Sequence, residues 1–360
     1  MTRRALLVLT ATIGALLTLA SIAPAVTLEE LSKLATEEGA LPPAAVREIK
    51  KYVQERVDQL KAAKDGDALA KACKAIADGY EVNTSSRWQV EYAQAASTEL
   101  LTVMEDKDPV KQVQAAIRIV NMPQYTVQPA LEKMAANANA GVRHWAARGY
   151  RWAGRALIQQ GETFFAKMLA TLETLGLHDG SGIVVGDVLI ALNPYGGAKP
   201  AENERLRKLQ DRILLVRCAD LRNGDEGMVT GYLRFLTALE AIGPEEQKLV
   251  TQMTADVLDA ATRAFAIPDL KEETGRALTD LVNVAEAKLM ALTATNRAAL
   301  QPIANDSARP LTQKGAEVRL TFKDYWQKEL AKKGIQVREV PAASAPAPKP
   351  ATAPAPETER

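Results

Sequence analysis

The sequence predicts an all-α protein, and three observations support that fold class. Apolar side chains recur every three or four residues along most of the chain, which is the spacing of one face of an α-helix. Aromatic residues make up 5% of the sequence and many apolar positions are Ala or Leu, which suit packed helices better than sheets. Turn signals recur at intervals of roughly 30 to 45 residues, the length of a helix pair. No comparable period-two alternation predicts a strand.

The helices in the first half of the chain are predicted from their start and stop signals. Thr27 and Glu30 form a capping-box pattern, and Gly39 ends the first helix. Pro42 opens the second helix, which ends near Asp65. The expected caps or first residues of the following helices are Asp67, Ser85 or Ser86, Asp108 with Pro109 behind it, Pro129 and Asn139.

The second half of the chain continues the helical pattern. The clearest helix covers residues 245–265, because Gly243-Pro244 is a typical start and Val250, Met253 and Val257 begin an apolar stripe. The other predicted helices cover residues 163–176, 183–192, 201–220, 226–241, 270–292 and 314–333. Helix pairs of this length favour an irregular solenoid of stacked pairs, and a compact, non-repeating helical domain is the alternative.

Residues 1–25 have the pattern of a secretory signal peptide. Arg3 and Arg4 precede an uncharged run from Ala5 to about Leu19, and Ala23-Pro24-Ala25 fits a cleavage site. We therefore expect an exported protein, periplasmic or extracellular, with no transmembrane helix after signal removal. The alternative is an uncleaved N-terminal segment that anchors the chain in a membrane, since the whole uncharged run from Ala5 to Val26 is about long enough to span a bilayer.

The rest of the chain divides by composition. We expect one helical domain over residues 26–334. Residues 335–360 are rich in Pro and Ala and contain few large apolar side chains, so we expect a disordered tail with polyproline II character.

Two segments resemble HEAT repeats, in which a helix commonly begins with Asp-Pro or Asn-Pro, then Val-Arg, then paired alanines. Asp108-Pro109-Val110-Lys111 precedes Ala115-Ala116, and Asn139-Ala140-Gly141-Val142-Arg143 precedes Ala146-Ala147. Position 141 is Gly where the family often has Pro, and position 111 is Lys where Arg is usual. The resemblance covers mainly residues 85–195. It implies a HEAT- or armadillo-like α-solenoid that binds other macromolecules and usually has no catalytic activity.

Charge and motifs exclude several functions. The 45 basic and 44 acidic residues leave a net charge of +1, which provides no general attraction for nucleic acid. The segment His178 to Gly182 lacks the nucleophile-elbow pattern, and Gly196-Gly197-Ala198-Lys199 lacks phosphate-loop spacing. Neither of the two histidines nor either cysteine has a partner at zinc-ligand spacing. We predict no cofactor, no metal site and no catalytic residue from these motifs.

The two cysteines, Cys73 and Cys218, both lie within helical patterns among apolar or small neighbours. We expect two buried thiols. Export would also allow a long-range disulfide between them, so that alternative stays open.

One helix carries a candidate binding surface. At 100° per residue, the segment Val142 to Leu157 places a basic stripe on one side and a small or apolar face on the other. The stripe consists of His144, Arg148, Arg151 and Arg155, with Trp145 and Trp152 along its flank. Arginine forks bind carboxylates and phosphates, and indoles offer rigid contact area. The alternative is an ordinary solvated face with ion-paired arginines and half-buried indoles.

These observations favour a non-enzymatic scaffold or binding protein of the cell envelope or exterior. Its partner would be a protein, an anionic polymer or a glycan of the envelope. One alternative is an envelope enzyme that uses carboxylate acid–base chemistry, for example on glycans. Such an enzyme would need a deep pocket with convergent acidic groups. A second alternative is a self-assembling structural component of the envelope.

Overall fold

The computed structural model describes residues 26–35, 41–83, 85–241 and 243–339. These residues are almost entirely helical and contain no β-strand, which confirms the predicted all-α fold class. Among them, no helix has the length and apolar character needed to cross a bilayer. The predicted signal peptide (1–25) and the larger part of the predicted tail (340–360) lie outside the described residues.

The chain divides into two compact units, unit 1 (Met1–Asp106) and unit 2 (Lys107–Arg360). Whether residues 26–334 form a single domain therefore stays a prediction. Unit 1 contains α2 (Leu28–Ala35), α3 (Pro43–Ala62), α4 (Gly66–Glu81), α5 (Ser86–Leu100) and the 3-10 helix η1 (Leu101–Glu105).

Aromatic side chains hold the helices of unit 1 together. The indole of Trp88 donates a hydrogen bond to the Gly79 carbonyl of α4 at 3.1 Å, and the Tyr92 hydroxyl donates to the Ile76 carbonyl at 2.9 Å. Both rings come from α5 and are fully buried. Because each polar tip has a partner, α5 can bury its two largest rings against α4 without leaving a donor unsatisfied.

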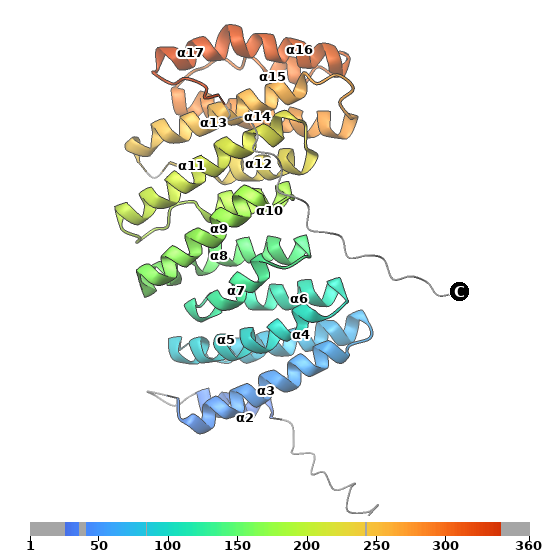
Figure 1. Ribbon diagram of the computed structural model, residues 1–360, viewed down its shortest axis with the longest axis vertical. Helices are drawn as coiled ribbons and strands as arrows, with labels where there is room; N and C mark the ends of the chain where they lie inside the picture. Colours follow the sequence, from blue (N-terminus) through green and yellow to red (C-terminus); the bar gives the residue numbers. More distant parts are fainter. Residues whose placement is uncertain (1–25, 36–40, 84, 242, 340–360) are drawn as a thin grey trace, which may run out of the picture. The chain divides into compact units, whose positions relative to one another are not determined.

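Unit 2 continues as a longer series of helices (Figure 1). Its first elements are α6 (Pro109–Val120), η2 (Tyr125–Val127), α7 (Gln128–Ala135), α8 (Ala140–Gln160), α9 (Glu162–His178) and α10 (Gly182–Ala191). They are followed by α11 (Pro200–Arg222), α12 (Glu226–Ala238), α13 (Pro244–Phe265) and α14 (Glu272–Thr293). The last are α15 (Gln301–Ala304), α16 (Leu311–Thr321), the π-helix η3 (Phe322–Trp326) and α17 (Gln327–Lys332).

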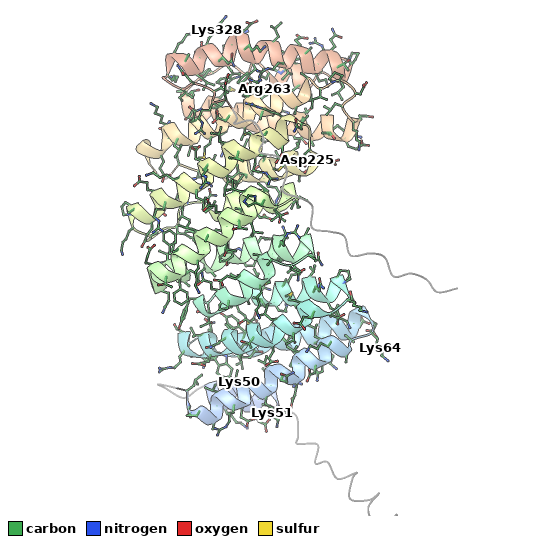
Figure 2. All side chains as sticks on the ribbon, in the orientation of Figure 1. Lys50, Lys51, Lys64, Asp225, Arg263 and Lys328 are labelled. Atoms are coloured by element: carbon green, nitrogen blue, oxygen red, sulfur yellow. The ribbon has the colours of Figure 1, made fainter. Side chains whose placement is uncertain are left out.

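The main helices of unit 2 alternate between two rows. In one row α8 packs between α6 and α10, and α12 packs between α10 and α14. In the other row α9 packs between α7 and α11, and α13 packs between α11 and α16. Figure 2 draws the side chains on these helices, and most of the buried ones are apolar. Helix pairs stacked in sequence order would produce this alternation, but the order identifies no repeat family, so the HEAT-like solenoid stays a prediction.

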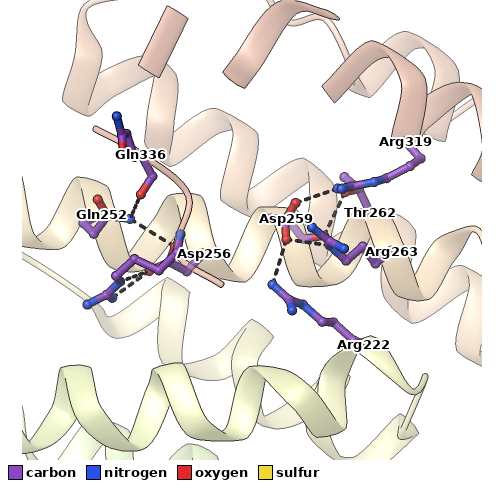
Figure 3. Close-up of polar contacts among 9 residues, drawn as sticks. Arg222, Gln252, Asp256, Asp259, Thr262, Arg263, Arg319 and Gln336 are labelled. Carbon is purple, nitrogen blue, oxygen red and sulfur yellow. Dashed lines mark hydrogen bonds and ion pairs between the residues drawn. The ribbon is translucent and has the colours of Figure 1, made fainter. Parts of the chain in front are cut away.

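A buried carboxylate on one helix of each row bridges the helices on both sides of it. Asp187 of α10 contacts His144 of α8 and forms an ion pair with Arg234 of α12 at 2.6 Å. Asp259 of α13 forms ion pairs with Arg222 of α11 at 3.0 Å and with Arg319 of α16 at 2.6 Å (Figure 3). Arg263 and Thr262 of α13 complete the surroundings of Asp259. A buried carboxylate requires such partners, so both contacts fix how neighbouring helices are aligned.

Glycines allow α10 and α12 to pack backbone against backbone. A Cβ atom added at Gly186 would lie 2.6 Å from the Gly231 Cα, and one added at Gly231 would overlap the Gly182 carbonyl oxygen. Real Cβ atoms do not approach other atoms so closely, so each of these positions excludes larger side chains.

Most predicted helix starts are confirmed. Thr27 and Glu30 exchange capping hydrogen bonds, and Ser85, Asp108 and Asn139 each accept a hydrogen bond from the first turn of the helix that follows. The cap predicted at Asp67 is wrong. Asp65 caps α4 instead, accepting a hydrogen bond from the Ala68 N–H at 2.8 Å, because the helix already begins at Gly66.

The segment between α14 and α16 was not predicted as structured, yet a single buried side chain organises it. The Glu286 carboxylate accepts hydrogen bonds from the backbone N–H groups of Ala299, Leu300 and Gln301, each at 2.8 Å. It also accepts one from the Trp326 indole at 2.6 Å. These four donors place α15 and η3 on the same carboxylate.

Both cysteines are buried free thiols, which confirms the prediction from the sequence. The alternative of a disulfide between Cys73 and Cys218 is therefore wrong. Burial raises the pKa of Cys218 to about 12. Such a thiol is protonated at neutral pH and poorly reactive.

The close contact between α10 and α12 generates a first prediction. Gly231→Ala should lower the free energy of unfolding by about 2 to 3 kcal/mol, because the added methyl group meets backbone atoms that cannot rotate away. Urea denaturation followed by circular dichroism measures the change. Gly180→Ala is the matched control, since a Cβ there has no neighbour within 4 Å. Equal stability of the two variants would show that the helices separate at little cost.

The carboxylate bridge in the α13 row generates a second prediction. Asp259→Asn should lower the free energy of unfolding by about 2 kcal/mol, because it removes the negative charge that Arg222 and Arg319 share. The loss is smaller than for a fully buried pair, since both arginines retain some contact with water. The control is Asp280→Asn, an exposed carboxylate of α14. A loss no greater than the control's would contradict a bridging role.

Candidate functional site

The candidate surface lies on α8, and the buried side of that helix is as predicted. Its small or apolar residues, Val142, Ala146, Gly149, Ala153 and Leu157, are all buried. Gly149 permits close packing, because a Cβ there would lie 2.9 Å from Cγ2 of Val120 and would overlap Leu131. Burial of this face turns the basic residues of α8 toward the other side.

The central arginine of the stripe lies between two indoles. The Arg148 guanidinium carbon is 4.6 Å from the ring centroid of Trp145 and 5.3 Å from that of Trp152. The two indole centroids are 6.4 Å apart, with an angle of 64° between the rings. These are cation–π distances. The guanidinium thus packs against both rings, and Trp152 remains 40% exposed.

Arg151 and Arg155 follow on the next turns of α8, and both are exposed. In the part of the chain that the structure describes, neither forms an ion pair with a carboxylate. The same holds for Arg148. The alternative interpretation of an ordinary face expected ion-paired arginines, which differs from these contacts, and half-buried indoles, which fits Trp145. We define the Arg/Trp surface as Trp145, Arg148, Arg151, Trp152 and Arg155.

The Arg/Trp surface borders an open pocket of about 400 Å³. The α8 wall of this pocket consists of Arg151, Trp152 and Arg155. The opposite wall comes from the end of α10 and the loop behind it, and consists of Ile190, Asn193, Pro194 and Tyr195. The lining thus contains two guanidinium groups, an indole and apolar side chains, and no carboxylate.

Tyr195 fixes the loop wall against α8. Its hydroxyl lies within hydrogen-bond distance of the Ala191 carbonyl at 2.8 Å and the Tyr150 carbonyl at 3.1 Å. Its backbone N–H donates to the Asn203 side chain at 3.0 Å. Burial raises the pKa of Tyr195, and the positive charge of Arg151 opposes this only in part. The phenol is therefore a neutral anchor at physiological pH.

We expected His144 in the outward stripe, and this prediction is wrong. It is half-buried, and its Nδ1 atom faces the buried carboxylate of Asp187 on α10. Its ring also lies 5.5 Å, centroid to centroid, from Trp145. Helical angle alone places His144 beside the arginines, but the adjacent helix covers the first turns of α8. His144 is thus part of the row contact rather than of the exposed surface.

The arrangement is suited to holding anions. An exposed guanidinium offers several N–H donors in a fixed plane, which match a carboxylate or phosphate. The adjacent indole offers a flat apolar face. No group of three or more His, Cys, Asp or Glu side chains that could hold a metal ion occurs among the described residues.

The loop wall of the pocket was not predicted from the sequence. Ile190, Asn193, Pro194 and Tyr195 belong to segments that carry no charge and no motif. The available signal was the asparagine-proline-tyrosine sequence at the end of a predicted helix, which indicates only a helix stop. No family model matches the chain, and no curated protein matches it either.

The anchoring of the loop generates a third prediction. A Cβ atom at Gly154 would overlap the Tyr195 ring, so Gly154→Ala should force the ring out of its place on α8. We expect a loss of about 2 kcal/mol in the free energy of unfolding and a more mobile pocket wall. Thermal unfolding and hydrogen exchange of residues 193–199 measure both effects. Gly196→Ala is the control, because a Cβ there has no neighbour within 4 Å. Unchanged exchange in Gly154→Ala would contradict the anchoring.

Proposed function

We propose that this chain is an exported, non-enzymatic helical binding protein that engages another macromolecule through the Arg/Trp surface of α8. The observation that carries the proposal is the set of three arginines without a carboxylate partner in the described residues, beside two indoles and an open pocket. Guanidinium groups arranged in this way present unused hydrogen-bond donors to an external anion.

The chemistry of the surface supports a macromolecular partner. Trp and Arg are among the side chains that contribute most binding energy at protein interfaces. Arg148 is held between two rings, and Trp152 packs on it. The partner would present carboxylates or phosphates, as an acidic protein segment, an anionic polymer or a glycan of the envelope does. The net charge of +1 gives no support to nucleic acid.

The proposed location and architecture follow from the sequence. The signal pattern of residues 1–25 supports export to the periplasm or the exterior. The Asp108 and Asn139 helix starts, each followed by an alanine pair, support a HEAT-like solenoid. The two-row order of unit 2 is compatible with that architecture. A solenoid presents extended surfaces suited to large partners.

A fourth prediction tests the proposed function. Replacing Arg148, Arg151 and Arg155 together by Ser should weaken capture of the partner by about 30-fold, which corresponds to about 2 kcal/mol of binding free energy. The measurement is a cross-linking pull-down from the native envelope with mass spectrometry, followed by titration of the captured partner. The wild-type interaction should also weaken as salt is added.

The control is Arg47→Ser, Arg87→Ser and Arg276→Ser combined, which removes the same charge from exposed positions on α3, α5 and α14. The control should bind like the wild type. If the α8 variant retains the partner at unchanged affinity, or if both variants lose it equally, the Arg/Trp surface is not the binding site.

A further inference from the structure

The chain does not leave the helices of unit 2 where α17 ends. Gly334 adopts a left-handed conformation with φ +70°, and the Ile335 N–H donates to the Leu330 carbonyl at 3.0 Å, which closes the helix. Ile335 is 5% exposed. Residues 335–339, which we expected in the tail, instead lie across α13 and α11. We call these five residues the strap.

The strap is held by three side chains from two helices. Gln252 of α13 donates to the Gln336 carbonyl at 2.8 Å (Figure 3). Asp256 of α13 accepts from the Arg338 backbone N–H at 2.9 Å and from its Nε at 2.7 Å. Asp211 of α11 accepts from both terminal nitrogens of Arg338, at 2.7 and 2.6 Å. We call Asp211, Gln252 and Asp256 the strap site.

The strap site is built to hold a cation. Asp256 is 1% exposed, and burial raises its pKa, while the charge and hydrogen bonds of Arg338 act in the opposite direction. Burial disfavours the charge of Arg338, but the two carboxylates more than offset this and raise its pKa. Because two carboxylates surround one guanidinium, removal of the arginine would leave both negative charges without this partner.

The attachment differs from the neighbouring bridge at Asp259. There the arginines belong to helices, which cannot leave without unfolding. Arg338 belongs to an irregular segment, and within the described chain no hydrogen bond between backbone groups joins residues 336–339 to the helices. Apart from the buried Ile335, the strap depends on side-chain contacts. Asp256 is buried, but the ion pair between Arg338 and Asp211 is partly open to water, since these side chains are 29% and 20% exposed. Such an attachment can open without unfolding the helices.

We propose that the strap site is a docking site for an extended, arginine-bearing segment, which the chain's own strap occupies in cis. An arginine-bearing segment of a partner displaces the strap. The required pattern is an apolar residue three positions before an arginine, as in Ile335 and Arg338. The Gln252 amide and the Asp256 carboxylate bind backbone groups of this segment, and Asp211 selects arginine over lysine through its two parallel hydrogen bonds. The site uses α11 and α13, so it is independent of the Arg/Trp surface on α8.

A fifth prediction tests the strap site on the full chain. The probe is a fluorescent synthetic peptide with the sequence of residues 334–339, and fluorescence anisotropy measures its binding. Arg338→Gln in the protein should release the strap, so the peptide should bind this variant at least about 10-fold more tightly than wild type. A peptide with Gln in place of Arg338 should bind neither protein. Glu339→Gln is the control, because Glu339 is exposed and the variant keeps the strap in place.

Equal binding of the peptide to wild type and to Arg338→Gln would overturn the proposal, as would binding that does not need the peptide's arginine. A second measurement covers the case in which Arg338→Gln does not fold. In wild type, the Arg338 backbone amide should be protected from hydrogen exchange, and excess peptide should accelerate its exchange. Protection that millimolar peptide leaves unchanged would show that the strap is a fixed part of the fold.

Discussion

The alignment of the helices in unit 2 depends on buried carboxylates that are shared between neighbouring helices. Asp187 lies between basic side chains of α8 and α12, and Asp259 lies between arginines of α11 and α16. Apolar contacts alone would tolerate a helix that slides or rotates by a fraction of a turn. A shared buried carboxylate does not, because any displacement leaves a charge without its partner. Each row thus contains a buried carboxylate that fixes neighbouring helices, and the contact between Gly186 and Gly231 brings α10 and α12 close together.

The same alignment produces the candidate site. His144 and Arg143, near the start of α8, are held by Asp187 of α10 and by Asp179 at the end of α9. These contacts fix the rotation of α8, so its later turns must direct Arg151 and Arg155 toward the end of α10. Tyr195 then attaches the following loop to α8 and completes the opposite wall. The pocket therefore results from the way in which α8, α9 and α10 are joined. Its polar side consists of Arg151 and Arg155, which take no part in the contacts that join these helices.

The helices and the Arg/Trp surface could be predicted from the sequence because both depend on neighbours a few positions apart. The caps at Asp108 and Asn139 involve donors two residues away, and the angular position of Arg151 follows from helix geometry. The partner of His144, the loop wall at Tyr195 and the strap could not be predicted. Arg338 pairs with Asp211, a separation of 127 residues, and no local pattern identifies such a pair. We assigned residues 335–339 to a disordered tail because of the composition of the segment. Composition does not reveal that a single arginine has carboxylate partners elsewhere in the fold.

The arginines of unit 2 differ in whether their guanidinium groups have oxygen partners on another element. Many arginines of unit 2 have oxygen partners on another element, among them Arg143, Arg207, Arg217, Arg222, Arg234 and Arg319. A cation that stabilises the fold needs such partners, because its removal from water must be offset. Arg151 and Arg155 are exposed at the rim of a pocket, and among the described residues neither pairs with a carboxylate. Their loss should therefore cost the fold little. A variant of α8 that keeps its stability but loses the interaction would separate binding from folding. Replacing a buried arginine such as Arg217 would not separate them, because it would also destabilise the fold.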